Sequence, residues 1–301
     1  MTRTGRRHMD ILDPLVVSRI GNLRLRARLI VEGFMAGLHR SPYHGFSSEF
    51  RDHRSYQPTD PSRLVDWRVY GRTDRLFVKQ FTDETNVRVH ILIDVSGSMG
   101  YRSAGEMTKL DYARTLAASL AYLLRKQRDA VGLIAFNDAL RVWIRPGTSS
   151  AHLDMLLVQL SRLTSYGNTG TVKVFADIAN RIPSRGMVIV LSDLMAPTEN
   201  MIPAIRHMAS GKHELIIIRI LDDDERRLPQ GRVLSLKDLE TGTRLTIRPA
   251  LVRRSYQEVS RRAWELLSDA VGGFRAQLVD VGTNEDFSSV LTSILASRLH
   301  L

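Results

Sequence analysis

Apolar residues in the last two-thirds of the chain follow two different spacings. Residues 89–93, apolar except for His90, form a short run with the length and β-branched character of a buried strand. Leu116, Leu120 and Leu124 instead recur at the spacing of an amphipathic helix. From Arg88 onward, apolar runs of the first kind alternate along the chain with segments of helical spacing. The sequence therefore predicts strands that alternate with helices.

The pattern gives six expected strands and six expected helices in this region. The strands cover residues 88–93, 130–136, 140–144, 187–191, 215–221 and 275–281. The helices cover residues 110–128, 151–163, 172–182, 202–208, 251–270 and a last segment from residue 286. This alternation predicts an α/β fold: a doubly wound, mostly parallel sheet with helices on both faces. Ligands of such folds bind at the carboxyl ends of the strands.

The pattern before residue 86 is different. Apolar positions over residues 12–38 predict one long amphipathic helix, with Arg24, Arg26 and Arg28 on its solvent side. The following segment, up to residue 85, is polar and irregular. We therefore divide the chain into an N-terminal extension, residues 1–85, and an α/β domain, residues 86–301. Within the domain, residues 227–249 predict a hairpin insertion that turns at Thr241 and Gly242.

Composition limits the class of protein. Of 301 residues, 43% are hydrophobic and 25% are charged, as in ordinary globular proteins, and the absence of cysteine excludes disulfides and thiolate metal sites. No apolar run approaches the ~20 residues of a membrane span, and no secretion signal follows the basic N-terminus. We therefore expect a cytoplasmic protein without a transmembrane segment.

The net charge of +11 keeps a second class of function open. The first 80 residues hold 15 Lys and Arg against 8 Asp and Glu, so the excess is concentrated there. Binding to nucleic acid or to an anionic membrane is an alternative function. No nucleic-acid-binding motif accompanies the charge, which favours a solvated face or a docking surface for an acidic protein.

Oxygen-bearing side chains collect where two strands and one helix meet a loop. The first strand is followed directly by Asp94, Ser96 and Ser98. A later strand is followed by Asp193, and one helix is preceded by Thr169. At one sheet edge they would supply two carboxylates and three hydroxyls. These hard oxygen ligands suit Mg²⁺, with Mn²⁺ or Ca²⁺ as alternatives, and argue against zinc or copper.

This arrangement resembles a known site. Asp94, Ser96 and Ser98 match the metal-ion-dependent adhesion site of von Willebrand factor A domains. The resemblance implies that the two serines and Thr169, with Thr171 as the alternative threonine, contact the metal directly. It implies that the two carboxylates act mainly through water, and that one coordination position stays open for an acidic residue of a partner protein.

A second resemblance spans nearly the whole chain. The motifs that carry it are residues 39–45, 56–61, 66–68 (Asp-Trp-Arg), 72–81, 109–113 (Lys-Leu-Asp-Tyr-Ala) and 238–242 (Asp-Leu-Glu-Thr-Gly). They are similar to those of the bacterial family called domain of unknown function 58, in its short form without membrane helices. The resemblance implies association with a MoxR-type AAA+ ATPase and a role as adaptor or cochaperone for a client protein.

Two further readings of the motifs remain. Residues 96–100 nearly form the Gly-x-Ser-x-Gly elbow of serine hydrolases, with Ser98 as nucleophile, but position 96 is serine and no histidine follows a late strand convincingly. We expect a protein that is not an enzyme and keep the hydrolase as an alternative. Residues 222–225, all acidic, are interpreted as a solvated loop rather than a second cation site.

Overall fold

The computed structural model describes residues 13–38, 54–55, 70–71, 77–78 and 87–297, except residues 104, 106, 169, 183, 184 and 212. Contacts divide the chain into two compact units, one of residues 1–35 and 87–301 and one of residues 36–86. In the second unit, β1 (Arg54–Ser55) pairs antiparallel with β2 (Phe77–Val78). The Asp-Trp-Arg motif at residues 66–68 lies outside the described residues.

The single helix predicted over residues 12–38 is wrong. The structure has two helices, α2 (Pro14–Ser18) and α3 (Leu23–Leu38). The break occurs because Asn22 caps the backbone N–H of Leu25, which starts a new helix. Arg26, expected on the solvent side, is half-buried and donates to the carbonyl oxygens of Ser18 and Ile20 at the end of α2.

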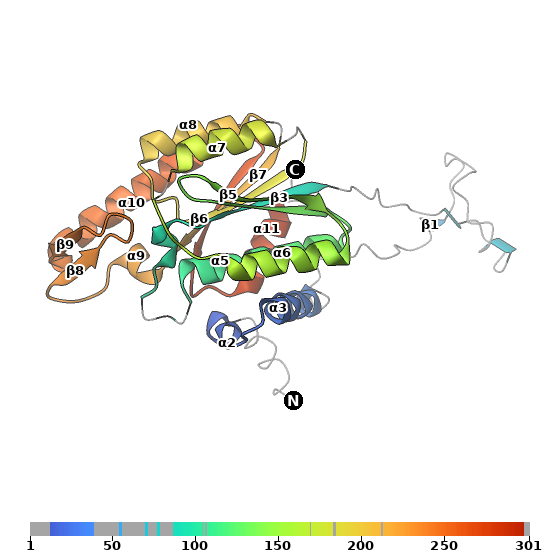
Figure 1. Cartoon of the computed structure of the whole chain (residues 1–301), viewed down its shortest axis with the longest axis horizontal. Coiled ribbons are helices and arrows are strands. Elements are labelled where there is room, and N and C mark those ends of the chain that lie inside the picture. The colour runs from blue at the N-terminus through green and yellow to red at the C-terminus, as the bar shows by residue number, and fades with distance from the viewer. Residues whose placement is uncertain are drawn as a thin grey trace. The chain divides into compact units, whose positions relative to one another are not determined.

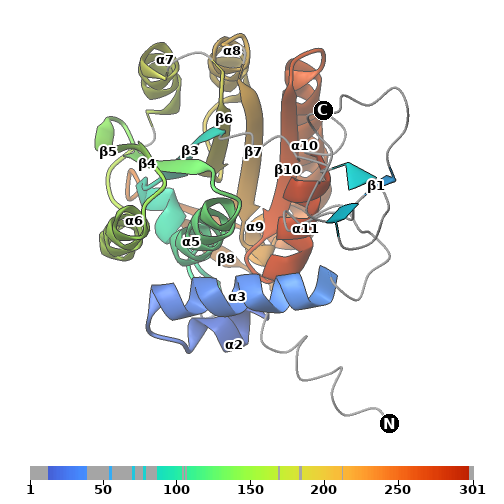
Figure 2. The same ribbon diagram turned by 90° about the vertical axis from the view of Figure 1, so that its right-hand side faces the viewer.

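A six-stranded sheet forms the centre of the larger unit, as Figures 1 and 2 show. Its order is β10-β7-β6-β3-β4-β5, and every pair is parallel except the edge pair β4 and β5. The predicted mostly parallel α/β sheet is therefore confirmed. The strands are β3 (Arg88–Asp94), β4 (Ala130–Phe136), β5 (Leu140–Gly147), β6 (Met187–Ser192), β7 (Glu214–Leu221) and β10 (Ala276–Gly282).

Helices cover both faces of this sheet. The helices α7, α8 and α10 lie on one face, and α5, α6 and α11 lie on the other (Figures 1 and 2). Their bounds are α5 (Lys109–Lys126), α6 (Ser150–Arg162), α7 (Thr171–Arg181), α8 (Thr198–Ala209), α10 (Pro249–Val271) and α11 (Phe287–Ser297). Strands β3, β4 and β6 are almost entirely buried because they are covered on both sides, which explains their continuous apolar runs.

Helix α3 adds a further layer outside α5 and α6. Arg24 forms an ion pair of 2.9 Å with Asp154 of α6, and Arg26 reaches the hydroxyl of Thr115 in α5 at 3.5 Å. The buried face of α3 carries Ala27, Ile30, Val31 and Phe34. In the part of the chain that the structure describes, no helix is long and apolar enough to cross a bilayer.

The insertion between β7 and β10 has two parts before α10. A short helix, α9 (Asp223–Arg227), comes first, and β8 (Leu234–Lys237) and β9 (Arg244–Ile247) then form an antiparallel hairpin. The hairpin confirms the prediction for residues 227–249. The solvated acidic loop expected at residues 222–225 is wrong, because Asp222 is buried and caps α9.

Candidate metal-binding site

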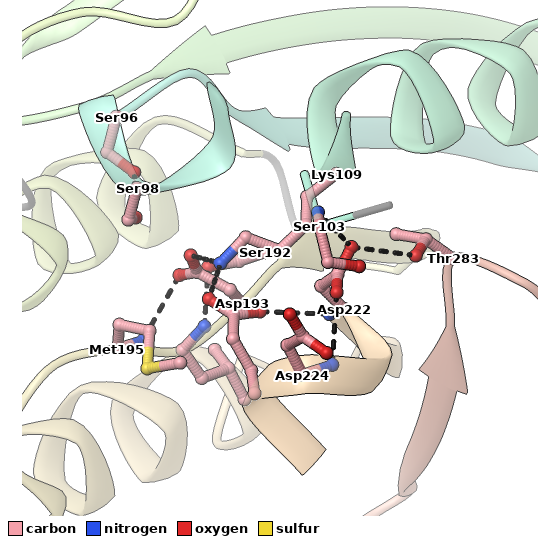
Figure 3. Close-up of polar contacts among 12 residues, drawn as sticks. Ser96, Ser98, Ser103, Lys109, Ser192, Asp193, Met195, Asp222, Asp224 and Thr283 are labelled. Carbon is pink, nitrogen blue, oxygen red and sulfur yellow. Dashed lines mark hydrogen bonds and ion pairs between the residues drawn. The ribbon is translucent and has the colours of Figure 1, made fainter. Parts of the chain in front are cut away.

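The first part of the site is the loop that leaves β3, which lies between β6 and β4 in the sheet. Asp94 ends β3 and is fully buried, and the 3-10 helix η2 (Gly97–Gly100) follows. The hydroxyl oxygens of Ser96 and Ser98 lie 3.1 Å apart, and both residues are labelled in Figure 3. The alternating spacing of the sequence therefore brings two hydroxyls to one point, as the motif predicts.

Asp94 and Asp193 meet because β3 and β6 are adjacent and in register. Ile93 pairs with Leu191, which places the end of β3 level with Ser192. The Ser192 hydroxyl donates to Oδ2 of Asp94 at 2.6 Å. The chain leaves β3 for β4 on one side and returns to β6 on the other, so the two carboxylates flank the switch point where ligands of such sheets bind.

The loop that carries the candidate threonine is attached to the serine loop. The N–H of Gly97 donates to the carbonyl of Gly167 at 2.9 Å, and the N–H of Tyr166 donates to the carbonyl of Val95 at 2.9 Å. Buried Asn137, at the end of β4, donates from Nδ2 to the Tyr166 carbonyl at 2.9 Å. Thr169 itself lies outside the described residues, so its predicted role stays a prediction.

Electrostatics make the carboxylate pair costly without a cation. Burial, reinforced by the nearby charge of Asp193, raises the pKa of Asp94 to about 7. Two acids that share a buried site cannot both ionise cheaply unless positive charge is present. A divalent cation beside them would favour the ionised form of both groups.

One positive charge is supplied by a lysine that the sequence showed only as part of a motif. Lys109, fully buried at the start of α5, lies 2.7 Å from Oδ2 of Asp193 and 2.6 Å from Oε1 of Glu225. Burial alone would lower the pKa of Lys109, but the two carboxylates outweigh it and raise that pKa above its ordinary value. Two carboxylates thus contact one ammonium, and Asp94 is close enough to Asp193 to be affected by its charge, so acidic groups outnumber this one cation.

The network continues to the ends of β7 and β10. Asp222 accepts the N–H of Ser103 at 3.1 Å and a longer bond of 3.4 Å from the Thr283 hydroxyl. Figure 3 shows Asp193, Lys109 and Asp222 with the contacts of Asp222 to Ser103 and Thr283. Asp222 and Glu225 form a capping box for α9, a signal the sequence already carried as Asp-x-x-Glu.

The donor set fits magnesium better than softer metals. Adjacent oxygens around an octahedral Mg²⁺ with bonds of ~2.1 Å lie about 3 Å apart. The 3.1 Å between the hydroxyl oxygens of Ser96 and Ser98 matches that spacing. Among the described residues, no group of three or more His, Cys, Asp or Glu side chains could hold a metal ion. The candidate site depends instead on hydroxyls with two carboxylates.

The surroundings of Ser98 offer little to a hydrolase. Its hydroxyl is paired with that of Ser96 rather than with a base. His213 precedes β7 and so lies at the amino end of the strands, while His90 is in the body of β3. His152 contacts the carbonyl of Val131, far from the strand ends where Ser98 lies. His300 lies outside the described residues.

Comparison with known sequences identifies the family. Residues 52–265 match the family described as "Protein of unknown function DUF58". The chain belongs to the DUF58 family. Uncharacterized proteins of Mycobacterium bovis and Mycobacterium tuberculosis are 28% identical to this DUF58 chain over 294 residues, which cover 96% of this chain and 92% of each relative.

Three solved structures are similar to this DUF58 protein over about 70% of its length. BatB from Bacteroides thetaiotaomicron is 14% identical with a TM-score of 0.47, covering 71% of this chain and 98% of that one. An aerotolerance-related membrane protein from Bacteroides fragilis is 16% identical with a TM-score of 0.47, covering 71% and 100%. The VWA domain of SpRpn10 is 14% identical with a TM-score of 0.41, covering 69% and 95%. The fold assignment itself rests on the strand order given above.

Proposed function

We propose that this DUF58 protein is a metal-dependent protein-interaction module rather than an enzyme. Ser96, Ser98 and Thr169 hold Mg²⁺, while Asp94 and Asp193 orient its waters. A carboxylate of the partner protein completes the coordination shell. The observation that supports this most directly is the pair of hydroxyls at magnesium spacing beside two buried carboxylates.

The partner in this proposal is a MoxR-type AAA+ ATPase, with the DUF58 protein as its cytoplasmic adaptor or cochaperone for a client. This part comes from the family motifs, among them residues 109–113 and 238–242. A metal-bound hydroxyl site suits an adaptor because a neutral shell leaves the cation attractive to an incoming carboxylate. Such a contact is released simply by losing the metal.

Titration calorimetry with Mg²⁺ tests the metal site. The full chain should bind Mg²⁺, and Ser98→Ala should weaken that binding at least tenfold because a direct ligand is lost. Ser161→Ala is the matched control, since that serine is exposed on α6 and its hydroxyl donates to the carbonyl of Val158 in the same helix. Magnesium at 100 times its dissociation constant should also stabilise the fold by about 2.7 kcal/mol. Full-strength binding by Ser98→Ala would contradict the assignment.

Co-precipitation with a MoxR-type ATPase tests the partner. Capture should occur in Mg²⁺, and both a chelator and Ser98→Ala should abolish it, whereas Ser161→Ala should not. Capture that survives chelation would refute the metal-bridged contact. Covalent labelling of Ser98 by a fluorophosphonate would instead favour the serine hydrolase.

A further inference from the structure

The tip of the β8–β9 hairpin lies directly on the serine loop. A Cβ atom added to Gly97 would lie 3.1 Å from the carbonyl oxygen of Leu239 and 3.5 Å from Cγ of Glu240. A side chain at position 97 would therefore be tight against the backbone of the hairpin tip. The Glu240 side chain consequently starts beside the residue that separates the two predicted metal-binding serines.

The tip of the hairpin is a turn held by several hydrogen bonds. The N–H of Asp238 donates to the Thr243 carbonyl at 2.8 Å, and the N–H of Gly242 donates to the Asp238 carbonyl at 2.9 Å. Oδ1 of Asp238 also accepts the N–H of Glu240 at 2.8 Å. Gly242 has a φ of 75°, which glycine adopts without strain. The backbone of Glu240 is thereby held in a fixed place on the tip.

Among the described residues, the hairpin is not part of the main sheet. Within the described chain, β8 and β9 pair with each other and form a two-stranded sheet of their own. An isolated two-stranded hairpin is marginally stable, so contacts at its tip strongly affect where it lies. It also exposes apolar side chains that a partner could cover, namely Val233, Leu239 and Leu245, at 56%, 43% and 61%.

We propose that Glu240 is an internal ligand of the metal site. Its carboxylate, attached to the Cγ that lies 3.5 Å from where a Cβ of residue 97 would be, occupies the open coordination position when Mg²⁺ binds. Carboxylate oxygen is the ligand that Mg²⁺ prefers from proteins. A partner's Asp or Glu must then displace Glu240. The hairpin therefore determines how strongly a partner's carboxylate has to bind the metal. This inference rests on the proposed metal site and names its regulation.

The test compares Glu240→Gln with Glu258→Gln in the full chain, using Mg²⁺ as the probe. Both changes remove one negative charge, and Glu258 is exposed on α10. Glu240→Gln should weaken Mg²⁺ binding about tenfold, as loss of a supporting carboxylate does, and Glu258→Gln should leave it unchanged. Hydrogen exchange gives a second readout: Mg²⁺ should slow exchange of the amides of Glu240 and Gly242 in the wild type but not in Glu240→Gln.

The outcomes separate this inference from the function it rests on. If Ser98→Ala loses Mg²⁺ but Glu240→Gln keeps wild-type affinity and the tip gains no protection, Glu240 is not a ligand and the metal site stands. If the wild-type chain binds no Mg²⁺ at all, the proposed function fails and the internal ligand fails with it. Weaker binding in Glu240→Gln together with a protected wild-type tip supports both.

Discussion

Replacing Lys109 with methionine should destabilise this protein more than any change to its surface charge. The methionine keeps the length and apolar stem of the lysine but removes the ammonium between Asp193 and Glu225. Lys109 and Asp193 are both 0% exposed and Glu225 is 18% exposed, so water cannot replace the lost partner. Breaking a buried pair in this way costs about 3–5 kcal/mol, because the remaining charges are left uncompensated.

Chemical and thermal unfolding measure this loss. For a domain of this size, each kcal/mol lowers the melting temperature by about 2–4 °C, so Lys109→Met should melt on the order of 10 °C lower. Lys126→Met is the matched control because it changes the same residue type at the exposed end of the same helix. Its cost should stay below about 1 kcal/mol. Both proteins are measured with chelator present, so that added metal does not contribute.

The pH dependence of the loss gives a sharper check. Burial already raises the pKa of Glu225, and Lys109→Met removes the ammonium that opposes this rise. The loss is therefore full above the raised pKa of Glu225 and shrinks as the pH falls through it, because the protonated acid carries no charge. The variant should be closer to wild type at pH 5 than at pH 8. Equal costs for Lys109→Met and Lys126→Met would refute this account of the ion pairs.

Two further predictions concern the sheet and its packing. Burial is the main cause that lowers the pKa of His90 to about 4, and the neighbouring His213 is the second cause. Between pH 6.5 and 4 the unfolded chain therefore binds a proton at this residue that the folded chain does not. Stability should fall by up to about 3 kcal/mol over that range, and His90→Asn should remove this slope while His207→Asn, at an exposed site, should keep it. Phe175→Ala should cost about 3–5 kcal/mol in denaturant unfolding, because the ring is fully buried in the core; a cost below 1 kcal/mol would contradict that packing.

The sequence predicted the sheet well because its central strands β3, β4 and β6 are buried on both faces. The strand expected at residues 130–136 matches β4, and the one at residues 88–93 stops one residue short of the end of β3. The break between α2 and α3 was missed because it depends on the side chains of Asn22 and Arg26 bonding to particular backbone groups. Apolar periodicity carries no trace of such bonds.

The sequence likewise revealed only those site residues whose positions follow from local patterns. Asp94, Ser96 and Ser98 could be recognised because they are neighbours in sequence, and Asp193 because a strand end has a predictable position. Lys109 could not, since its carboxylate partners lie 84 and 116 residues away. The approach of Glu240 to Gly97 is equally invisible in the sequence, because it arises from where the hairpin folds back.

The separation between Lys109 and Glu225 has a consequence for synthesis of the protein. A ribosome adds about 5–20 residues per second, so roughly 6–23 seconds pass between making the lysine and making its second partner 116 residues later. During that interval the ammonium remains hydrated, and α5 cannot dock fully onto the nascent sheet without burying a charge that still lacks one counterion. The first strands therefore complete their packing against α5 only after β7 and α9 have been synthesised. Until then their apolar surfaces remain exposed, where they can aggregate or bind a chaperone.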